Sequence, residues 1–363
     1  MKHLWRLFRV LHGNSHNHID RNRVKKGLVF VFSLGVLAMA GIMFFTFDTS
    51  TLDALKKMNP VYLLLAVLAV LISWLFSAAA FYVLAKAIKR PISMAASGRV
   101  YLGGSFFGFI TPFGSGLMPT QAYLLSKEKL SPGQATAVTG ARAMTSSWLF
   151  AFLGLMILIA FRSSVPEGIG TNILIGVVAV ALIWSLFALY FIKRPADAIR
   201  IVRRIFNIRP MSRFFKDDLR ESFESKIDDE INHLSANLKD LFSPKNYFAL
   251  GLVFLVEVGA WFALFSVLPL VLLGLGWEGS FSTLIFRMFL LFCLVPASPT
   301  PGGSGAVEVG FTMLLFSVVP AHLIGLVVLV WRALTYYFTL LAGGFVVAKL
   351  FSRMSATERA DVG

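Results

Sequence analysis

Two arginines stand in long apolar segments of this sequence, each at nearly the same distance behind a copy of one hexapeptide. The copies are TPFGSG at residues 111–116 and TPGGSG at residues 300–305, identical at five of six positions. Arg142 lies 26 residues beyond the first copy and Arg332 lies 27 residues beyond the second, both in an Arg-Ala-x-Thr sequence. A guanidinium group binds phosphate through paired N–H donors. The pattern therefore predicts an internal duplication that carries an anion site.

The hexapeptides would contribute backbone groups to the same chemistry. A residue before proline avoids the helical region and proline cannot continue a helix, so each copy should end one half-helix and begin another. The free N–H groups and the positive dipole end of the second half-helix favour a phosphate. We expect the serine of each copy to cap this half-helix or to add a hydroxyl donor. The residues predicted to bind phosphate are Arg142, Arg332, Thr111, Gly114, Ser115, Gly116, Thr300, Gly302, Gly303, Ser304 and Gly305.

Two carboxylates in apolar surroundings could act at the same site. Glu257 lies within an apolar run, and Glu308 follows the second hexapeptide by three residues. Each could balance an arginine, take a proton or meet a cationic headgroup, and Glu308 could instead cap its half-helix. An alternative is that the arginines pair with these carboxylates only to hold helices together, and that the hexapeptides are ordinary loops. Weaker candidates for ligand contacts are Arg99, Arg287, Gln121 and Tyr123.

The composition places these residues in a membrane. Of the 363 residues 57% are hydrophobic, and the mean hydropathy is +0.74, more apolar surface than a soluble domain could bury. The net charge of +15 is concentrated in segments that flank the apolar runs, which is typical of cytoplasmic loops and argues against a nucleic-acid partner. The single cysteine, Cys293, excludes an internal disulfide framework. No cluster of ligands accompanies the histidines near the amino terminus, so we predict no metal and no cofactor.

The apolar runs predict an all-α polytopic protein. Each hexapeptide interrupts a segment, Ser93–Leu125 or Phe281–Val319, that we expect to dip into the membrane and return to the same side. The protein would then have six full spans and two re-entrant hairpins, or seven to eight spans by hydropathy alone. Both termini would be cytoplasmic. The full spans are expected at about 27–47, 61–85, 133–161, 170–192, 246–275 and 322–350.

The two repeats should have inverted topology, because the first enters its opening span from outside and the second from inside. At about 1.5 Å per residue, Arg142 and Arg332 would each lie about 14–15 Å deep, half of a core about 30 Å thick. The two guanidinium groups should therefore meet near the midplane, where charged side chains usually face a cavity or a partner. The predicted organisation is a basic cytoplasmic amino terminus at 1–26, a first span and outer loop at 27–57, repeat one at 58–163, a linking span at 164–192, a charged cytoplasmic helical loop at 193–245, repeat two at 243–351 and a cytoplasmic tail at 352–363.

Two stretches resemble the signatures of a known family. PTPGGSGAVE, at residues 299–308, resembles the P-x-P-G-G-x-G-x-x-E signature of the lysylphosphatidylglycerol synthase transmembrane-region family. This flippase-like family is named after the membrane half of the bacterial multiple peptide resistance factor. GGSFFGFITPFGSGLMPTQAYLLSK, at residues 103–127, looks like its first signature, and the resemblance covers about residues 25–350. The full-length factor carries a soluble acyltransferase-like domain, which we expect this chain to lack.

The resemblance implies a lipid translocase in the inner membrane of a bacterium, with a link to antimicrobial peptide resistance. It would move phosphatidylglycerol, an aminoacyl-phosphatidylglycerol or a similar phosphate-bearing lipid between leaflets, and would not be an enzyme. Its partners would be membrane phospholipids, with a lipid-modifying enzyme encoded elsewhere and an oligomer as further options. The alternatives are a membrane-embedded lipid-modifying transferase, a polyprenyl-phosphate carrier and a non-transporting scaffold of an envelope enzyme.

Overall fold

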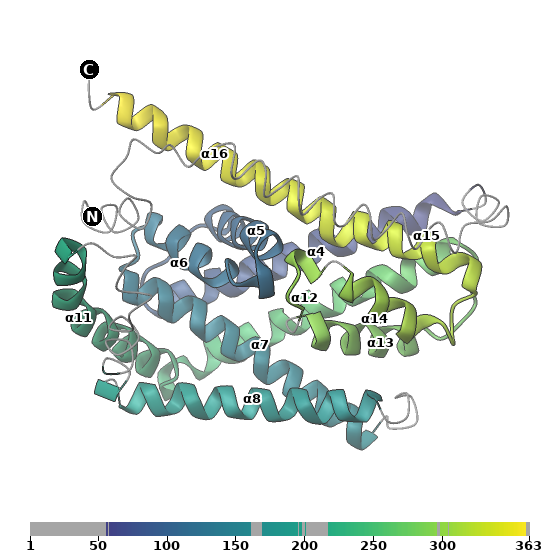
Figure 1. Ribbon diagram of the computed structural model, residues 1–363, viewed down its shortest axis with the longest axis horizontal. Coiled ribbons are helices and arrows are strands. Elements are labelled where there is room, and N and C mark those ends of the chain that lie inside the picture. Colours follow the sequence, from purple (N-terminus) through teal and green to yellow (C-terminus); the bar gives the residue numbers. More distant parts are fainter. Residues whose placement is uncertain are drawn as a thin grey trace.

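A computed structural model describes Lys56 and residues 58–160, 169–194, 196–197, 200 and 217–360, apart from 296, 297 and 304. Within this part of the chain the regular elements are all helices (Figure 1), so the predicted all-α class is confirmed. The basic segment 1–26, the predicted first span at 27–47 and the interior of the charged loop at 201–216 lie outside the described residues.

Long apolar helices form the body of the molecule. Four stretches are long and apolar enough to cross a membrane, within the described part of the chain: Pro60–Ala87, Pro132–Ile159, Pro244–Gly274 and His322–Leu350. They lie where the sequence predicts spans. The corresponding helices are α4 (Pro60–Ala87), α7 (Pro132–Ala160), α12 (Tyr247–Gly274, preceded by the 3-10 turn η3, Pro244–Asn246), and α15 (Ala321–Arg332), which continues through the π-helical segment η6 (Ala333–Tyr337) into α16 (Phe338–Ala360). The segment predicted as a linking span forms α8 (Ile169–Lys193), in which Leu174–Tyr190 is a shorter apolar stretch.

Local capping chemistry fixes where several of these helices begin. Asn59 Oδ1 accepts a hydrogen bond from the Val61 amide at the start of α4, where Pro60 occupies a position that lacks an intrahelical acceptor. At the start of α7, the Ser131 hydroxyl and the Gln134 amide side chain each accept from the other residue's backbone N–H. This reciprocal pair is a capping box, and it sets the register of the helix that carries Arg142.

Two helical hairpins are inserted among the long helices. The first consists of α5 (Met94–Ile110), the 3-10 turn η1 (Pro112–Gly114) and α6 (Leu117–Lys127). The second consists of α13 (Phe281–Leu294), the 3-10 turn η5 (Pro301–Gly303) and α14 (Ala306–Leu315). The returning helices have 11 and 10 residues, so each is about 15–17 Å long, about half of a hydrocarbon core.

The tips of the two hairpins meet in the middle of the molecule. Figure 1 shows α5 and α6 beside one half of the long helices and α13 and α14 beside the other half. The turns η1 and η5 are in contact, and η5 also contacts α5. The two hexapeptides, which lie far apart in the sequence, are therefore neighbours in space.

The opening helices of the two units, α4 and α12, pack against each other in antiparallel orientation. The Asn59 amide donates to the Gly274 carbonyl at 2.8 Å, whereas Phe76, further along α4, lies against Gly259, which is earlier in α12. Both units have the same order of elements: a long helix, a short helix, a 3-10 turn, a short helix and a long helix.

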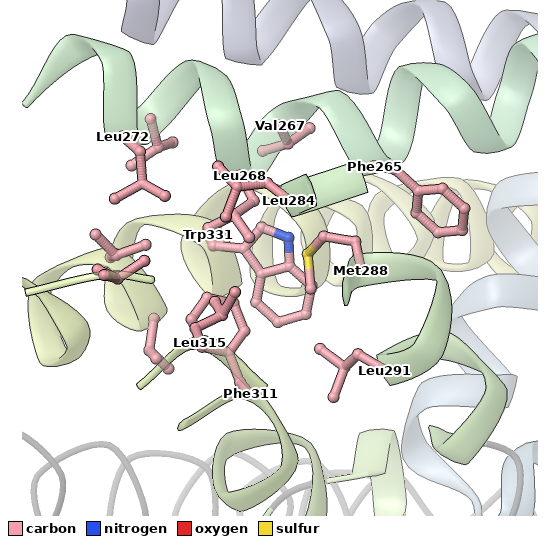
Figure 2. Close-up of a cluster of buried hydrophobic side chains, with 14 of the residues drawn as sticks. Phe265, Val267, Leu268, Leu272, Leu284, Met288, Leu291, Phe311, Leu315 and Trp331 are labelled. Atoms are coloured by element: carbon pink, nitrogen blue, oxygen red, sulfur yellow. The ribbon is translucent and has the colours of Figure 1, made fainter. Parts of the chain in front are cut away.

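Each hairpin has its own hydrophobic core. The larger core packs both arms of the second hairpin against α12 and α15, with Trp331 among Leu268, Met288 and Phe311 (Figure 2). The other core packs the first hairpin against α4, α7 and the end of α11 (Asp217–Leu241). In α11, the backbone at His233 lies against Gly133, so this charged helix supports the beginning of α7.

Candidate functional site

The two hexapeptides adopt the same turn at their third and fourth positions. Phe113 has φ 54° and ψ 16°, and Gly302 has φ 61° and ψ 13°. The next residues, Gly114 and Gly303, have φ 64° and 67°. All four are in the left-handed region, which glycine adopts freely but which costs a residue with a side chain about 1–3 kcal/mol. The sequence repeat is therefore also a repeat of backbone conformation.

At the first tip, no side chain in the described part of the chain caps the beginning of α6. Thr111 Oγ1 donates to the Phe107 carbonyl at 2.7 Å and accepts from the Gly116 amide at 2.8 Å. The hydroxyl that holds this turn is thus that of Thr111, whereas the sequence predicts this role for Ser115. The amides of Leu117 and Met118 belong to the first turn of α6, where N–H groups have no intrahelical acceptor, and the N-cap residue supplies no side-chain hydrogen bond.

The second tip is closed by a resident carboxylate. Glu308 Oε2 accepts from the Gly305 amide at 2.7 Å, so Glu308 occupies the position at the start of α14 that an anion would take. Its other oxygen, Oε1, lies 2.9 Å from Nε and 2.8 Å from Nη2 of Arg332. Arg332 Nη1 donates to the Gly302 carbonyl at 3.1 Å. Ser304 lies outside the described residues, and Thr300 Oγ1 is 2.8 Å from the Ser298 hydroxyl.

A π-helical turn follows Arg332 and places an aromatic ring beneath the second tip. The Tyr336 ring lies 5.0 Å from the Arg332 guanidinium carbon and 4.9 Å from the Phe109 ring at the end of α5. A Cβ atom on Gly302 would lie 2.3 Å from this ring. The Tyr336 hydroxyl is buried without a hydrogen-bond partner among the described residues. Single π-helical turns are frequent at functional sites.

Arg142 lies in a second cluster, between the two units. Its Nε is 2.9 Å from Oε1 of Glu257, although the pair lacks the alignment of a hydrogen bond. Oε2 of the same carboxylate accepts from the Ser146 hydroxyl at 2.6 Å. The guanidinium carbon lies 4.8 Å from the Phe81 ring and 5.6 Å from the Tyr101 ring. Arg142 retains 14% exposure of its side chain, compared with 5% for Arg332.

The guanidinium groups of the two arginines differ in how many of their N–H donors are used within the protein. Two nitrogens of Arg332, Nε and Nη1, donate hydrogen bonds to protein oxygens, and Nη2 lies 2.8 Å from Glu308 Oε1 without the alignment of a hydrogen bond. No described residue forms a hydrogen bond with the terminal amino groups of Arg142. The depth of the two arginines in their spans predicts that the guanidinium groups meet in one site, but each pairs with a different carboxylate, Arg142 with Glu257 and Arg332 with Glu308. Arg142 lies beside Tyr101 of α5, whereas Arg332 is linked to α5 through the Tyr336 ring, which packs against Phe109. Tyr101 and Phe109 are eight residues, or about 12 Å, apart along that helix.

Arg99 and Arg287 connect the arms of their hairpins at the ends remote from the tips. Arg99 donates to Glu128 Oε1 at 2.7 Å, just beyond the end of α6. Arg287 donates to the Leu314 carbonyl and to the Ser317 hydroxyl at the end of α14. They precede their hexapeptides by 12 and 13 residues, a spacing that could have revealed this shared role. As ligand contacts, the role for which the sequence makes them weaker candidates, both arginines would have to leave these partners.

Gln121 and Tyr123 occupy different places on α6. Gln121 is buried against Gly104 of α5, and its amide nitrogen has no hydrogen-bond partner among the described residues. The Tyr123 ring lies 5.1 Å from the Lys127 ammonium, near the end of α6. Gln121 thus lies between the arms of the first hairpin, whereas Tyr123 lies toward its base.

Known proteins are similar to this chain over most of its length. A family model described as the lysylphosphatidylglycerol synthase TM region matches residues 30–343, which confirms the resemblance seen in the sequence. A UPF0104 membrane protein of Archaeoglobus fulgidus is 27% identical over 86% of this chain and 93% of its own length. Two UPF0104 membrane proteins of Methanothermobacter thermautotrophicus are 23% and 30% identical, over 80% and 50% of this chain and 85% and 53% of their own lengths. The chain is an integral membrane protein that belongs to the lysylphosphatidylglycerol synthase transmembrane-region family.

Proposed function

We propose that this protein is a lipid translocase, which moves a phosphate-bearing lipid such as phosphatidylglycerol or an aminoacyl-phosphatidylglycerol between the leaflets of a cell membrane. The observation that carries the proposal is the contact between η1 and η5 amid long apolar helices. Broken backbone at membrane depth is tolerated where it is buried in protein or lines a cavity. Broken helices that meet in the middle of a membrane protein are typical of secondary transporters.

In this proposal the two hairpins are re-entrant and the two units are inverted repeats. The antiparallel packing of α4 and α12 supports inversion. The ties made by Arg99 and Arg287 support re-entry, because each joins the beginning of a hairpin to its end. The first hairpin would enter from the cytoplasmic side and the second from the opposite side, with both chain termini in the cytoplasm.

The first tip offers more groups for a lipid phosphate than the second. The first tip offers the amides at the beginning of α6, whereas the equivalent position of the second tip already holds Glu308. The terminal amino groups of Arg142 can donate hydrogen bonds to a phosphate, because the ion pair with Glu257 is made through Nε. We propose that the lipid phosphate moves between the first tip and Arg142, and that Arg332 holds the second tip in place.

The acyl chains would stay in the bilayer while the headgroup passes through the protein. Such a carrier needs no covalent step, so we propose that the protein is not an enzyme. Proton transfer at Glu257 would be one means of driving the movement, since this carboxylate is buried beside Arg142. A lipid-modifying enzyme encoded elsewhere would supply or use the lipid.

Reconstitution in liposomes tests the proposal. Vesicles carry fluorescent phosphatidylglycerol in both leaflets, and a membrane-impermeant reductant then bleaches the outer label. We expect the protein to make the inner label accessible, and Arg142→Gln to abolish this effect while Lys239→Gln, an exposed control on α11, retains it. Chemical change of the lipid would instead identify a transferase. If the lipid neither moves nor changes chemically, a role as a non-transporting scaffold would be favoured. Full activity of Arg142→Gln would exclude the proposed phosphate contact.

A further inference from the structure

Phe113 is held at the tip of the first hairpin in a conformation that phenylalanine avoids. Its φ of 54° lies in the left-handed region, where the side chain crowds the backbone. Burial of an aromatic ring could offset this strain, but 60% of Phe113 is exposed. Packing against the described residues therefore does not account for the position of this ring.

The second hexapeptide shows that the turn itself needs no side chain at this position. Gly302 has nearly the same backbone angles as Phe113. The Tyr336 ring fills the space in which a Gly302 side chain would lie. The turn itself thus carries an aromatic side chain at the first tip and not at the second, and no described side chain caps the returning helix of the first tip.

We propose that Phe113 is the contact for the hydrocarbon chain of the transported lipid. This inference rests on the proposed function and adds to it a place for the apolar part of the cargo. Leu117 begins the α6 helix four residues after Phe113, so a phosphate at the first turn of α6 has its lipid chains close to this ring. An exposed aromatic ring next to an anion site suits a molecule that is charged at one end and apolar at the other.

Substitution separates this role from a structural one. Phe113→Gly relieves the backbone strain, so its thermal unfolding temperature should equal or exceed that of the wild type. Its lipid flux should fall about tenfold, the factor expected for loss of one partly buried aromatic contact. Phe113→Leu keeps an apolar side chain and should recover most of the flux. Wild-type flux in a stably folded Phe113→Gly protein overturns the proposal.

Photocrosslinking supplies a readout that does not depend on transport. Benzoylphenylalanine replaces Phe113 in the full chain, in vesicles of phosphatidylglycerol and phosphatidylcholine, and crosslinked lipids are identified by mass spectrometry. The control site is Phe248, which is 86% exposed near the start of α12 and should capture lipids in bilayer proportions. Enrichment of phosphatidylglycerol at position 113 supports the proposal, and bilayer proportions or protein-only products at that position overturn it.

The two readouts distinguish failure of this inference from failure of the proposed function. Wild-type vesicles without lipid movement, but with enriched crosslinking at position 113, would exclude translocation and retain Phe113 as a lipid contact. If lipid moves at the same rate in the wild type and in Phe113→Gly, and position 113 shows no enriched crosslinking, the proposed translocation stands and Phe113 is not a lipid contact.

Discussion

Arg332 and Glu308, 24 residues apart in the chain, form a buried ion pair that joins the last long helix to the second hairpin tip. The same carboxylate accepts from the Gly305 amide, and the same guanidinium group donates to the Gly302 carbonyl. Both charges are compensated within the protein, and the second tip becomes a fixed surface against which the first tip rests.

Arg332→Met should destabilise the protein strongly. Removal of one partner from a buried ion pair typically costs about 3–5 kcal/mol, because the remaining charge stays buried without compensation. We expect a large fall in the thermal unfolding temperature of the purified protein in detergent. Arg332→Met combined with Glu308→Gln should recover part of the loss, since neither side chain is then charged.

The matched control for Arg332→Met is Arg99→Met. Arg99 and Glu128 are 37% and 31% exposed, and exposed pairs contribute at most about 1 kcal/mol. If Arg332→Met were no more destabilising than Arg99→Met, the second tip would not depend on the buried pair.

Glu257→Gln should show whether Glu257 only balances the charge of Arg142 or also couples lipid movement to proton transfer. The amide can still accept from the Ser146 hydroxyl, which lies 2.6 Å from Oε2, so the packing should survive. Glutamine cannot bind and release a proton, so lipid flux should lose its response to an imposed pH gradient. Flux is measured in vesicles with and without the gradient, and Ser146→Ala is the control for loss of the hydrogen bond. A pH response of the variant equal to that of the wild type would exclude Glu257 as the coupling group.

The positions of the helices can be predicted from the sequence, because apolar runs and Gly/Pro breaks are local signals. Apolar runs gave the body of α4 and α12 to within two residues of their ends, and the Gly/Pro hexapeptides marked both breaks. The partners of the charged residues were less accessible, because pairing depends on which helices come together. Arg142 contacts Glu257 of the other unit, whereas Arg332 contacts Glu308 of its own. Nothing in the spacing distinguishes these outcomes.

Some local features were also beyond the sequence pattern. Thr111 and not Ser115 accepts from the Gly116 amide, since the tight turn brings its hydroxyl back across five residues. The π-helical turn at 333–337 contains no proline or glycine from which it could be predicted. Within it, Tyr336 packs against Phe109 and against the second tip, contacts that a local pattern in the sequence does not show.

Gly302→Ala should destabilise the second tip by more than backbone strain alone. A Cβ atom at this position would meet Tyr336 at 2.3 Å, and the left-handed conformation adds its own cost of about 1 kcal/mol or more. Gly276→Ala is the matched control, since Gly276 has φ 78° with nothing within 4 Å of the added Cβ. Thermal unfolding should show a larger loss for Gly302→Ala. Equal losses would show that the tip can move away from Tyr336 without cost.

Ser131→Cys and Ser282→Cys should react with a membrane-impermeant maleimide from opposite faces of the membrane. Ser131 precedes α7 at the base of the first hairpin, and Ser282 lies at the beginning of the second, both exposed. Each hairpin returns to the end at which it begins, and the two tips meet between these ends. The experiment uses a Cys293→Ser background in sealed right-side-out and inverted vesicles. Labelling of both positions from one face would mean that the units are not inverted, and the two tips could then not serve one lipid from opposite leaflets.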